Sequence, residues 1–172
     1  MIILKTERLI LRLLEKNDKS MIQALLNQAS FIENIGDKGV RDLDGALHYI
    51  STGPLAMQKA LGFSLYCCEL KSTGETIGLS GLIKRDEITH PEIGFAFLSK
   101  FFRQGFGFES VSSVINYAKN TLGIEVLQAI CNPSNKPSIN LLSKTGFVFQ
   151  KKVMLDSAGD EINLYEKVLA ID

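Results

Sequence analysis

The chain has 172 residues, of which 45% are hydrophobic and 22% are charged, values typical of a folded globular protein and not of a disordered one. We expect one domain over residues 1–172, because a chain of this length builds one ordinary core and rarely divides. Nineteen basic and nineteen acidic residues give a net charge of +0, which argues against a dedicated nucleic-acid binder.

Membrane insertion, secretion and metal chemistry find little support in the sequence. No apolar run reaches the roughly 18 residues that a bilayer-spanning helix requires, and the first residues do not read as a secretory signal. The cysteines, Cys67, Cys68 and Cys131, form no C-x-x-C pair, and His48 and His90 add no metal-ligand spacing. We therefore expect a cytoplasmic protein with free thiols, no membrane anchor and no metal site.

The first part of the chain predicts a strand followed by helices. Residues 9–13 are apolar and short, as in a strand, and residues 17–18 offer an N-cap for a helix that reaches Ala29. Glycine and charged residues predict a loop over 33–46. A short helix is expected after it and ends at Gly53-Pro54.

Three strands and a long helix are expected in the middle of the chain. The strands cover 63–70, 76–83 and 92–98, with a hairpin turn between the first two. The helix follows residues 101–107 and ends near Gly123. Its predicted buried stripe is Phe108, Val111, Ile115, Ala118 and Leu122.

The last part predicts a strand at 126–131, a helix with Pro137 in its first turn, and strands at 147–155 and 161–169. The hairpins give antiparallel pairs, and the strand–helix–strand unit that begins at 92 permits a parallel pair by a right-handed crossover. The predicted fold is therefore α/β, with a mixed, mostly antiparallel sheet of about seven strands and about four helices packed against it.

Residues 102–109, Phe-Arg-Gln-Gly-Phe-Gly-Phe-Glu, form the most informative segment. The first N–H groups of a helix have no internal partner, and the helix dipole adds positive charge there. The glycines let a bound group approach the backbone and Arg103 adds a full charge, so this turn suits a phosphate or pyrophosphate. The alternative is a plain strand-to-helix turn whose glycines serve only its shape.

Other nucleotide-binding motifs fit less well. A P-loop is excluded because no G-K-[ST] occurs. The dinucleotide pattern G-x-G-x-x-G has Ser110 at its third glycine, and the acidic Glu125 begins a strand instead of ending one. A dinucleotide-dependent oxidoreductase is kept as a weaker alternative, since antiparallel hairpins precede the glycine turn.

Several segments, taken in order, resemble the GNAT superfamily of N-acetyltransferases, and most of all its ribosomal-protein N-terminal acetyltransferase (RimJ/RimL-like) branch. The matching segments are Thr6–Arg12, Thr73–Gly78, Glu92–Phe95, Gly105–Gly107, Asn132–Ser138 and Gly146-Phe147. Together they extend over nearly the whole chain.

The resemblance implies acetyl-CoA as acetyl donor and a primary amine as acceptor, either a protein N-terminus or a small molecule, which attacks directly in a ternary complex. It also implies a monomer or homodimer, and a pantetheine arm lying where the parallel strands splay apart after a bulged strand. The implied coenzyme contacts are Phe97, Leu98, Arg103, Gln104, Gly105, Phe106, Gly107, Phe108, Asn135 and Ser138.

The chemistry of acetyl transfer suggests catalytic residues. The amine must lose a proton, and Glu92 is the first candidate for the base, with His90 second. The alternative for Glu92 is a solvated carboxylate at a strand end. An N–H freed by a bulge would stabilise the oxyanion. Ser138 would protonate the leaving thiolate, or alternatively bond to the helix backbone.

Two positions depart from the family pattern. Phe102 stands where many relatives carry Gln or Arg, and Leu142 where many carry a tyrosine acid. The missing tyrosine keeps a non-catalytic acyl-CoA-binding sensor open as an alternative function. We expect residues 17–60 to build the acceptor pocket.

Overall fold

The computed structural model describes residues 1–155, 159 and 161–169. Its strands form one sheet in the order β1-β2-β3-β4-β5-β6-β8-β7. The strands are β1 (Ile2–Lys5), β2 (Leu9–Arg12), β3 (Leu65–Leu70), β4 (Thr76–Ile83), β5 (Glu92–Phe97), β6 (Val126–Cys131), β7 (Val148–Val153) and β8 (Ile162–Val168). The helices are α1 (Lys19–Asn27), α2 (Ala29–Ile35), α3 (Leu43–Thr52), α4 (Pro54–Leu61), α5 (Phe106–Asn120) and α6 (Lys136–Lys144).

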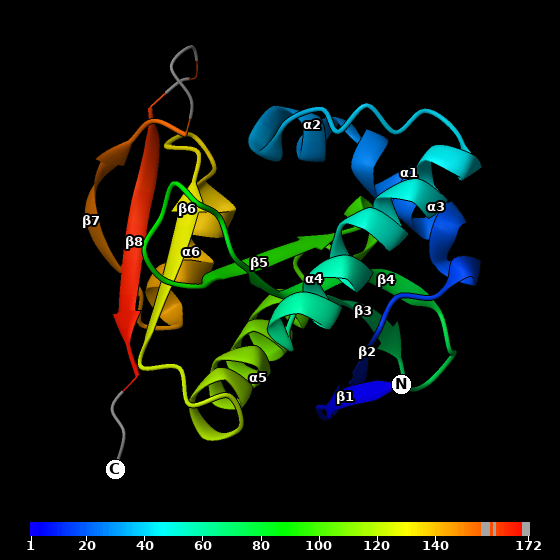
Figure 1. Cartoon of the computed structure of the whole chain (residues 1–172), viewed down its shortest axis with the longest axis horizontal. Coiled ribbons are helices and arrows are strands. Elements are labelled where there is room, and N and C mark those ends of the chain that lie inside the picture. Colours follow the sequence, from blue (N-terminus) through cyan, green and yellow to red (C-terminus); the bar gives the residue numbers. More distant parts are fainter. Residues whose placement is uncertain (156–158, 160, 170–172) are drawn as a thin grey trace.

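Neighbouring strands are antiparallel except for β5 and β6, which run parallel. The helix α5 connects these two strands, as the crossover rule requires. The parallel pair is short, because only Glu92 and Gln128 are in register. Figure 1 shows the result, with β6, β7, β8 and α6 on one side and β1 to β5 on the other.

Helices cover both faces of the larger part of the sheet. Figure 1 places α1 to α4 together on one face and α5 on the opposite one. The α5 face holds a core that includes Ile93, Phe97, Phe106 and Val111. The other face holds a second core, in which Leu25 and Ile50 of the helices join strand residues. Alternation along β5 divides its side chains between these two cores.

The predicted fold class is confirmed, with an eight-stranded sheet in place of about seven strands. The additional strand is β1, whose four residues precede the first predicted strand and pair with it. So short a strand at a sheet edge has too few residues to show an alternating pattern.

The helical region before β3 is the least well predicted part. The single helix expected up to Ala29 divides at Gln28, whose backbone is extended (φ −69°, ψ 144°). The loop expected over 33–46 contains the end of α2 and the start of α3. Gly53-Pro54 does end α3, but Pro54 also begins α4, because proline is favoured in the first turn of a helix.

The start of the long helix also differs from the prediction. The buried stripe begins at Phe106, whereas Phe108 is 39% exposed. Val111, Ile115 and Ala118 are buried as expected, and Leu122 is partly buried. The helix therefore starts two residues earlier than the stripe indicated, inside the glycine turn itself.

Cys67, Cys68 and Cys131 are buried and free. No helix in the described part of the chain is long and apolar enough to cross a membrane. Within the same residues, no group of three or more His, Cys, Asp or Glu side chains is arranged to hold a metal ion.

Candidate functional site

The segment before α5 has an unusual backbone. Arg103 has φ 60° and Gly105, the N-cap of α5, has φ 84°, both in the left-handed region. Glycine adopts this conformation without strain, whereas Arg103 does so at some energetic cost. The first hydrogen bond of the helix joins the Glu109 N–H to the Gly105 carbonyl at 3.1 Å. The N–H groups of residues 106–108 therefore lack an intrahelical acceptor and are directed at whatever lies before the helix.

A polar network fixes this turn to the β1–β2 connection. Arg8 donates to Glu109 from its side chain (2.7 Å) and from its backbone (2.7 Å), and to the Gln104 carbonyl (2.9 Å). Thr6 also donates to Glu109. Burial alone would raise the pKa of Glu109, but the hydrogen bonds from Thr6 and Arg8 outweigh it and lower that pKa.

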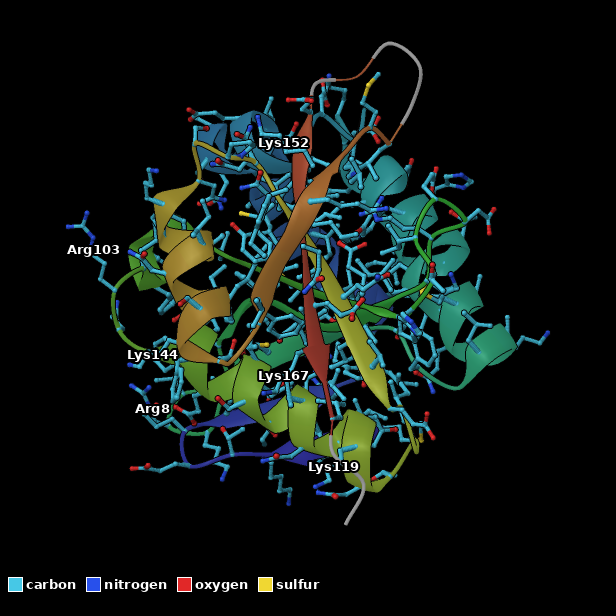
Figure 2. All side chains as sticks on the ribbon, turned by 90° about the vertical axis from the view of Figure 1, so that its left-hand side faces the viewer. Arg8, Arg103, Lys119, Lys144, Lys152 and Lys167 are labelled. Atoms are coloured by element: carbon cyan, nitrogen blue, oxygen red, sulfur yellow. The ribbon has the colours of Figure 1, made fainter. Side chains whose placement is uncertain are left out.

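Cationic side chains surround the start of α5. Arg8 lies over the Phe106 ring with its guanidinium carbon 4.4 Å from the ring centroid, and Lys144 of α6 lies over Phe108 at 4.4 Å. Figure 2 shows Arg103 extending outward from the loop ahead of the helix, away from the body of the protein. Because Glu109 neutralises Arg8, the net positive charge added near this end of the helix comes from Arg103 and Lys144.

The opening between β5 and β6 leaves backbone groups of β5 unpaired by a strand. The register between β4 and β5 runs without interruption from Gly78–Phe97 to Ile83–Glu92, so the expected bulge is absent. The free groups arise instead because β6 diverges. Alternation along an antiparallel strand directs the N–H and C=O groups of Phe95 and Phe97 away from β4 and toward this opening.

Not all of these groups are available. The Phe97 carbonyl accepts from Gln28 Nε2 at 2.8 Å, which leaves its N–H and both groups of Phe95. At Leu98, the N–H donates to the Ile77 carbonyl and the carbonyl accepts from Phe101, each at 2.9 Å. Both backbone groups of Leu98, one of the predicted coenzyme contacts, are therefore already paired, whereas those of Phe95 are not.

Two cavities meet at this opening. The turn cavity, of about 450 Å³, extends along the glycine turn and is lined by residues that include Arg103, Gly105, Phe106 and Gly107. The Glu92 cavity, of about 330 Å³, lies beyond it. The residues that line both are Phe31, Asn34, Ile35, Phe95, Ala96, Asn135 and Ser138. A ligand in one cavity can therefore reach a ligand in the other.

Asn135 and Ser138 stand at this junction because of how α6 begins. Asn135 is the N-cap of α6, and its Oδ1 accepts from the Ser138 N–H at 3.2 Å. Among the described residues no hydrogen bond involves Ser138 Oγ. The alternative in which this hydroxyl bonds to the helix backbone is therefore absent from the structure.

Glu92 is buried, with 4% of its surface exposed, and forms an ion pair with Arg85 Nε. Desolvation raises its pKa, and Arg85 opposes that shift. The alternative of a solvated strand-end carboxylate is therefore wrong. His90, the second candidate for the base, is partly buried, and its backbone N–H donates to Gln128 Oε1 at 3.0 Å. It does not line either cavity.

Sequence reasoning missed several polar residues of the Glu92 cavity. Lys38 and Tyr49 come from the region where the acceptor pocket was expected, but neither was singled out. Arg85 comes from the polar segment 84–91, where a lone arginine gives no signal of its partner. Only the folded chain brings Lys38, Tyr49 and Arg85 to Glu92.

Comparisons with known proteins agree with this geometry. Residues 8–148 match the family described as acetyltransferase (GNAT) domain. The chain is 30% identical over 146 residues to the uncharacterized N-acetyltransferase YoaA of Bacillus subtilis (strain 168), covering 84% of this chain and 82% of YoaA.

Solved structures share the fold. An acetyltransferase from Salmonella typhimurium that modifies the N-terminal serine of ribosomal protein L7/L12 superposes with a TM-score of 0.82 at 15% identity, over 99% of this chain and 100% of that one. The microcin C7 self-immunity acetyltransferase MccE, in complex with acetyl-CoA and AMP, gives 0.80 at 16% identity, over 95% and 93%. By the match over residues 8–148 and the likeness to YoaA, the chain belongs to the GNAT acetyltransferase family.

Proposed function

We propose that this protein transfers the acetyl group of acetyl-CoA to a primary amine by direct attack within a ternary complex. The observation that carries the proposal is the meeting of the two cavities at Phe95, Ala96, Asn135 and Ser138. One cavity begins at a helix N-terminus suited to a diphosphate, and the other contains a buried carboxylate suited to a proton acceptor. A donor and an acceptor bound on the two sides would face each other at the junction.

The coenzyme would occupy the turn cavity. The N–H groups of residues 106–108 and the charge of Arg103 would bind its diphosphate, with Gly105 beside it. Gln104 and Phe108 do not line the cavity and would contact only the part of the coenzyme that extends beyond it. The free Phe97 N–H and Phe95 carbonyl would pair with the amides of the pantetheine arm, as a neighbouring strand would, and the Phe95 N–H would remain for the acetyl group. Bound MccE provides an example of a similar fold holding acetyl-CoA.

The amine would occupy the Glu92 cavity. Glu92 would remove a proton from the incoming ammonium, directly or through a water molecule, because its raised pKa makes it a better base than an ordinary glutamate. The nitrogen then forms a bond to the acetyl carbon as the carbon–sulfur bond breaks. The Phe95 N–H would donate to the oxygen on which charge develops. Ser138 Oγ would give its proton to the departing sulfur and be reprotonated by the second proton that the nitrogen loses, directly or through water, so that a neutral amide and a thiol are formed.

The acceptor would be either a protein N-terminus or a small amine. The Salmonella relative is described as modifying a ribosomal-protein N-terminus. Another protein of this fold, from Vibrio cholerae, is described as a spermidine N-acetyltransferase chimera. The fold therefore supports both classes of acceptor, and the choice depends on the residues of the Glu92 cavity.

The proposal is tested by calorimetry with acetyl-CoA and by an assay of thiol release in the presence of varied amines. We expect acetyl-CoA to bind, NAD and NADP not to bind, and thiol release to require an amine. Binding without amine-dependent release would favour the sensor alternative. Failure to bind acetyl-CoA would refute the proposal.

The oxidoreductase alternative loses its support from the fold. It required a sheet that opens with β-α-β units, whereas β1 to β5 are joined in antiparallel pairs.

A further inference from the structure

The described lining of the Glu92 cavity carries more positive than negative charge. Among the described residues that line it, Lys38 and Arg85 are cationic at neutral pH and Glu92 is the one anionic residue. The chain as a whole has a net charge of +0, so this imbalance is local. Arg85 is paired with Glu92, so the excess charge is that of Lys38, whose side chain lines the cavity but remains exposed to solvent. A cation in this position can bind an anionic group of a molecule held in the cavity.

Lys38 and Arg85 both retain hydrogen-bond donors. Arg85 uses Nε for Glu92, which leaves its two terminal amino groups. Among the described residues, Lys38 has neither an ion pair nor a hydrogen bond from its side chain. The pKa of Lys38 is lowered by desolvation and by Arg85, while Glu92 raises it, so the three groups lie within electrostatic reach of one another.

Tyr49 adds a neutral donor to the same wall. Tyr49 lines the cavity, and no hydrogen bond from or to its hydroxyl is present in the described part of the chain. Burial raises the pKa of Tyr49, and the nearby Arg85 opposes that rise. The hydroxyl therefore stays protonated at neutral pH and can donate.

The remainder of the wall is largely apolar. It is contributed by both layers of the fold, α2 and α4 on one side and the strands β3, β4 and β5 on the other. The principal apolar residues are Phe31, Ile35, Met57, Leu65, Ile83 and Ile93. A bound molecule would bury hydrocarbon here and place its charged group at Lys38 and Arg85.

We propose, on the basis of the acetyl transfer proposed above, that the acceptor is a small amine with an apolar body and an anionic group, a carboxylate or a phosphate, bound by Lys38, Arg85 and Tyr49. The amine end points to Glu92 and the junction with the turn cavity. A polyamine is a poor acceptor, because its further positive charges meet two cations. A peptide N-terminus is also a poor acceptor, since the carboxyl group of its first residue is an uncharged amide.

Matched amines test the anionic group. Leucine and leucinamide share the α-amine and the apolar side chain and differ in the carboxylate. We expect kcat/KM for leucine to exceed that for leucinamide by about tenfold or more, the usual effect of a hydrogen bond to a charged group. The amine of leucinamide loses its proton more readily than the amine of leucine. This difference alone would favour leucinamide, so a preference for leucine cannot result from it.

Further arms distinguish the source of the anion and the class of acceptor. The first ratio compares kcat/KM for 2-aminoethyl phosphate with that for 2-aminoethanol, and the second compares leucine with leucinamide. If the first ratio is the larger, the site binds a phosphate. If the second is the larger, it binds a carboxylate. Spermidine and a neutral peptide are the remaining arms. If either is acetylated more efficiently than the anionic amines, the proposal is wrong.

Variants at Lys38 tie the preference to the cavity. Lys38→Gln should reduce the leucine preference about tenfold, and Lys38→Glu should reverse it in favour of leucinamide, while the KM for acetyl-CoA is unchanged. The control is Lys59→Gln on the exposed end of α4, which lines neither cavity and should behave as wild type.

The outcomes separate this inference from the proposed function. If acetyl-CoA does not bind, acetyl transfer itself is refuted. If acetyl-CoA binds and amines are acetylated without a preference for an anionic group, or the preference survives Lys38→Glu, only the inference is overturned. If none of the anionic amines is acetylated or binds to the protein loaded with coenzyme A, as followed by calorimetry, the inference is also overturned.

Discussion

The two cavities that meet at Ser138 are built from different materials. The turn cavity depends mainly on backbone groups, namely the helix N-terminus after Gly105 and the unpaired edge of β5. The Glu92 cavity depends on side chains, with Lys38, Arg85 and Glu92 supplied by separate segments. A site made of backbone binds what every coenzyme molecule has in common, whereas a site made of side chains can change its ligand by substitution. Variants on the two sides should therefore have separable effects.

The largest effect is expected on the Glu92 side. Glu92→Gln preserves shape and removes the base, so kcat should fall by about 10²- to 10³-fold, the usual contribution of general base catalysis. The affinity for acetyl-CoA, measured by calorimetry, should not change. Glu125→Gln, at an exposed glutamate just before β6, is the matched control. A loss of coenzyme affinity in Glu92→Gln would contradict the division between the cavities.

The pH dependence of Glu92 sharpens the same test. Because burial raises its pKa, the base becomes protonated at a higher pH than an ordinary glutamate, and the rate should fall as the pH is lowered through that value. Glu92→Gln should lack this acid limb. The contribution of Glu92 to the free energy of unfolding depends on pH in the opposite direction to the rate. A carboxyl with a raised pKa favours the folded state below its unfolded pKa of about 4.3, and this contribution is lost as the pH rises through the folded value.

The turn cavity could be predicted from the sequence better than the Glu92 cavity, because its glycine turn is a single segment, whereas the Glu92 cavity is built from side chains of separate segments. The glycines, the helix start and Arg103 lie within one short segment, so the turn could be identified without knowledge of distant contacts. Lys38 and Arg85 are 47 residues apart (85 minus 38) and lie in segments without a recognisable motif. No local pattern indicates that folding brings them together.

The fold shows the same limit. The central strands and α5 have regular hydrophobic patterns and were predicted close to their true bounds. The division between α1 and α2 depends on Gln28, whose side chain donates to the Phe97 carbonyl and accepts from the Ser99 N–H. That interaction with the end of β5 holds the residue extended, and it spans about 70 positions of the chain. Local propensity contains no information about it.

A smaller effect, confined to the turn cavity, is expected from Gly105→Val. Gly105 has φ +84°, and a Cβ there would lie 3.1 Å from Arg8 Nη2. A branched residue must therefore change the backbone of the turn and displace the Arg8 side chain that is hydrogen-bonded to it. The affinity for acetyl-CoA should then fall by about 100-fold. Gly123→Val is the control, because Gly123 has φ +64° but open space around it. Equal losses of affinity in both variants would contradict a role for Gly105 in coenzyme binding.

Substitution of Arg8, which holds the turn in place, should weaken acetyl-CoA binding less than substitution within the turn. Arg8→Met removes the side-chain hydrogen bonds to Glu109 and to the Gln104 carbonyl, leaves the backbone hydrogen bond to Glu109 in place, and keeps an apolar contact with Phe106. We expect the KM for acetyl-CoA to rise about tenfold with kcat unchanged, because Arg8 positions the turn without taking part in the chemistry. Lys152→Met, which breaks an exposed ion pair with Glu161 far along the chain, should leave both constants unchanged. A fall in kcat alone would contradict this positioning role.

The smallest effect is expected at Ser138, where the two cavities meet. If its hydroxyl protonates the departing sulfur, Ser138→Ala should slow single-turnover thiol release by about threefold to tenfold, since water can replace a weak acid. The Kd for acetyl-CoA should stay the same, because the side chain would act on the bond being broken and not on the bound ground state. Ser143→Ala, at an exposed serine of the same helix, controls for any change in α6. A weaker Kd with an unchanged rate would place Ser138 among the contacts of the pantetheine arm, on the coenzyme side of the division.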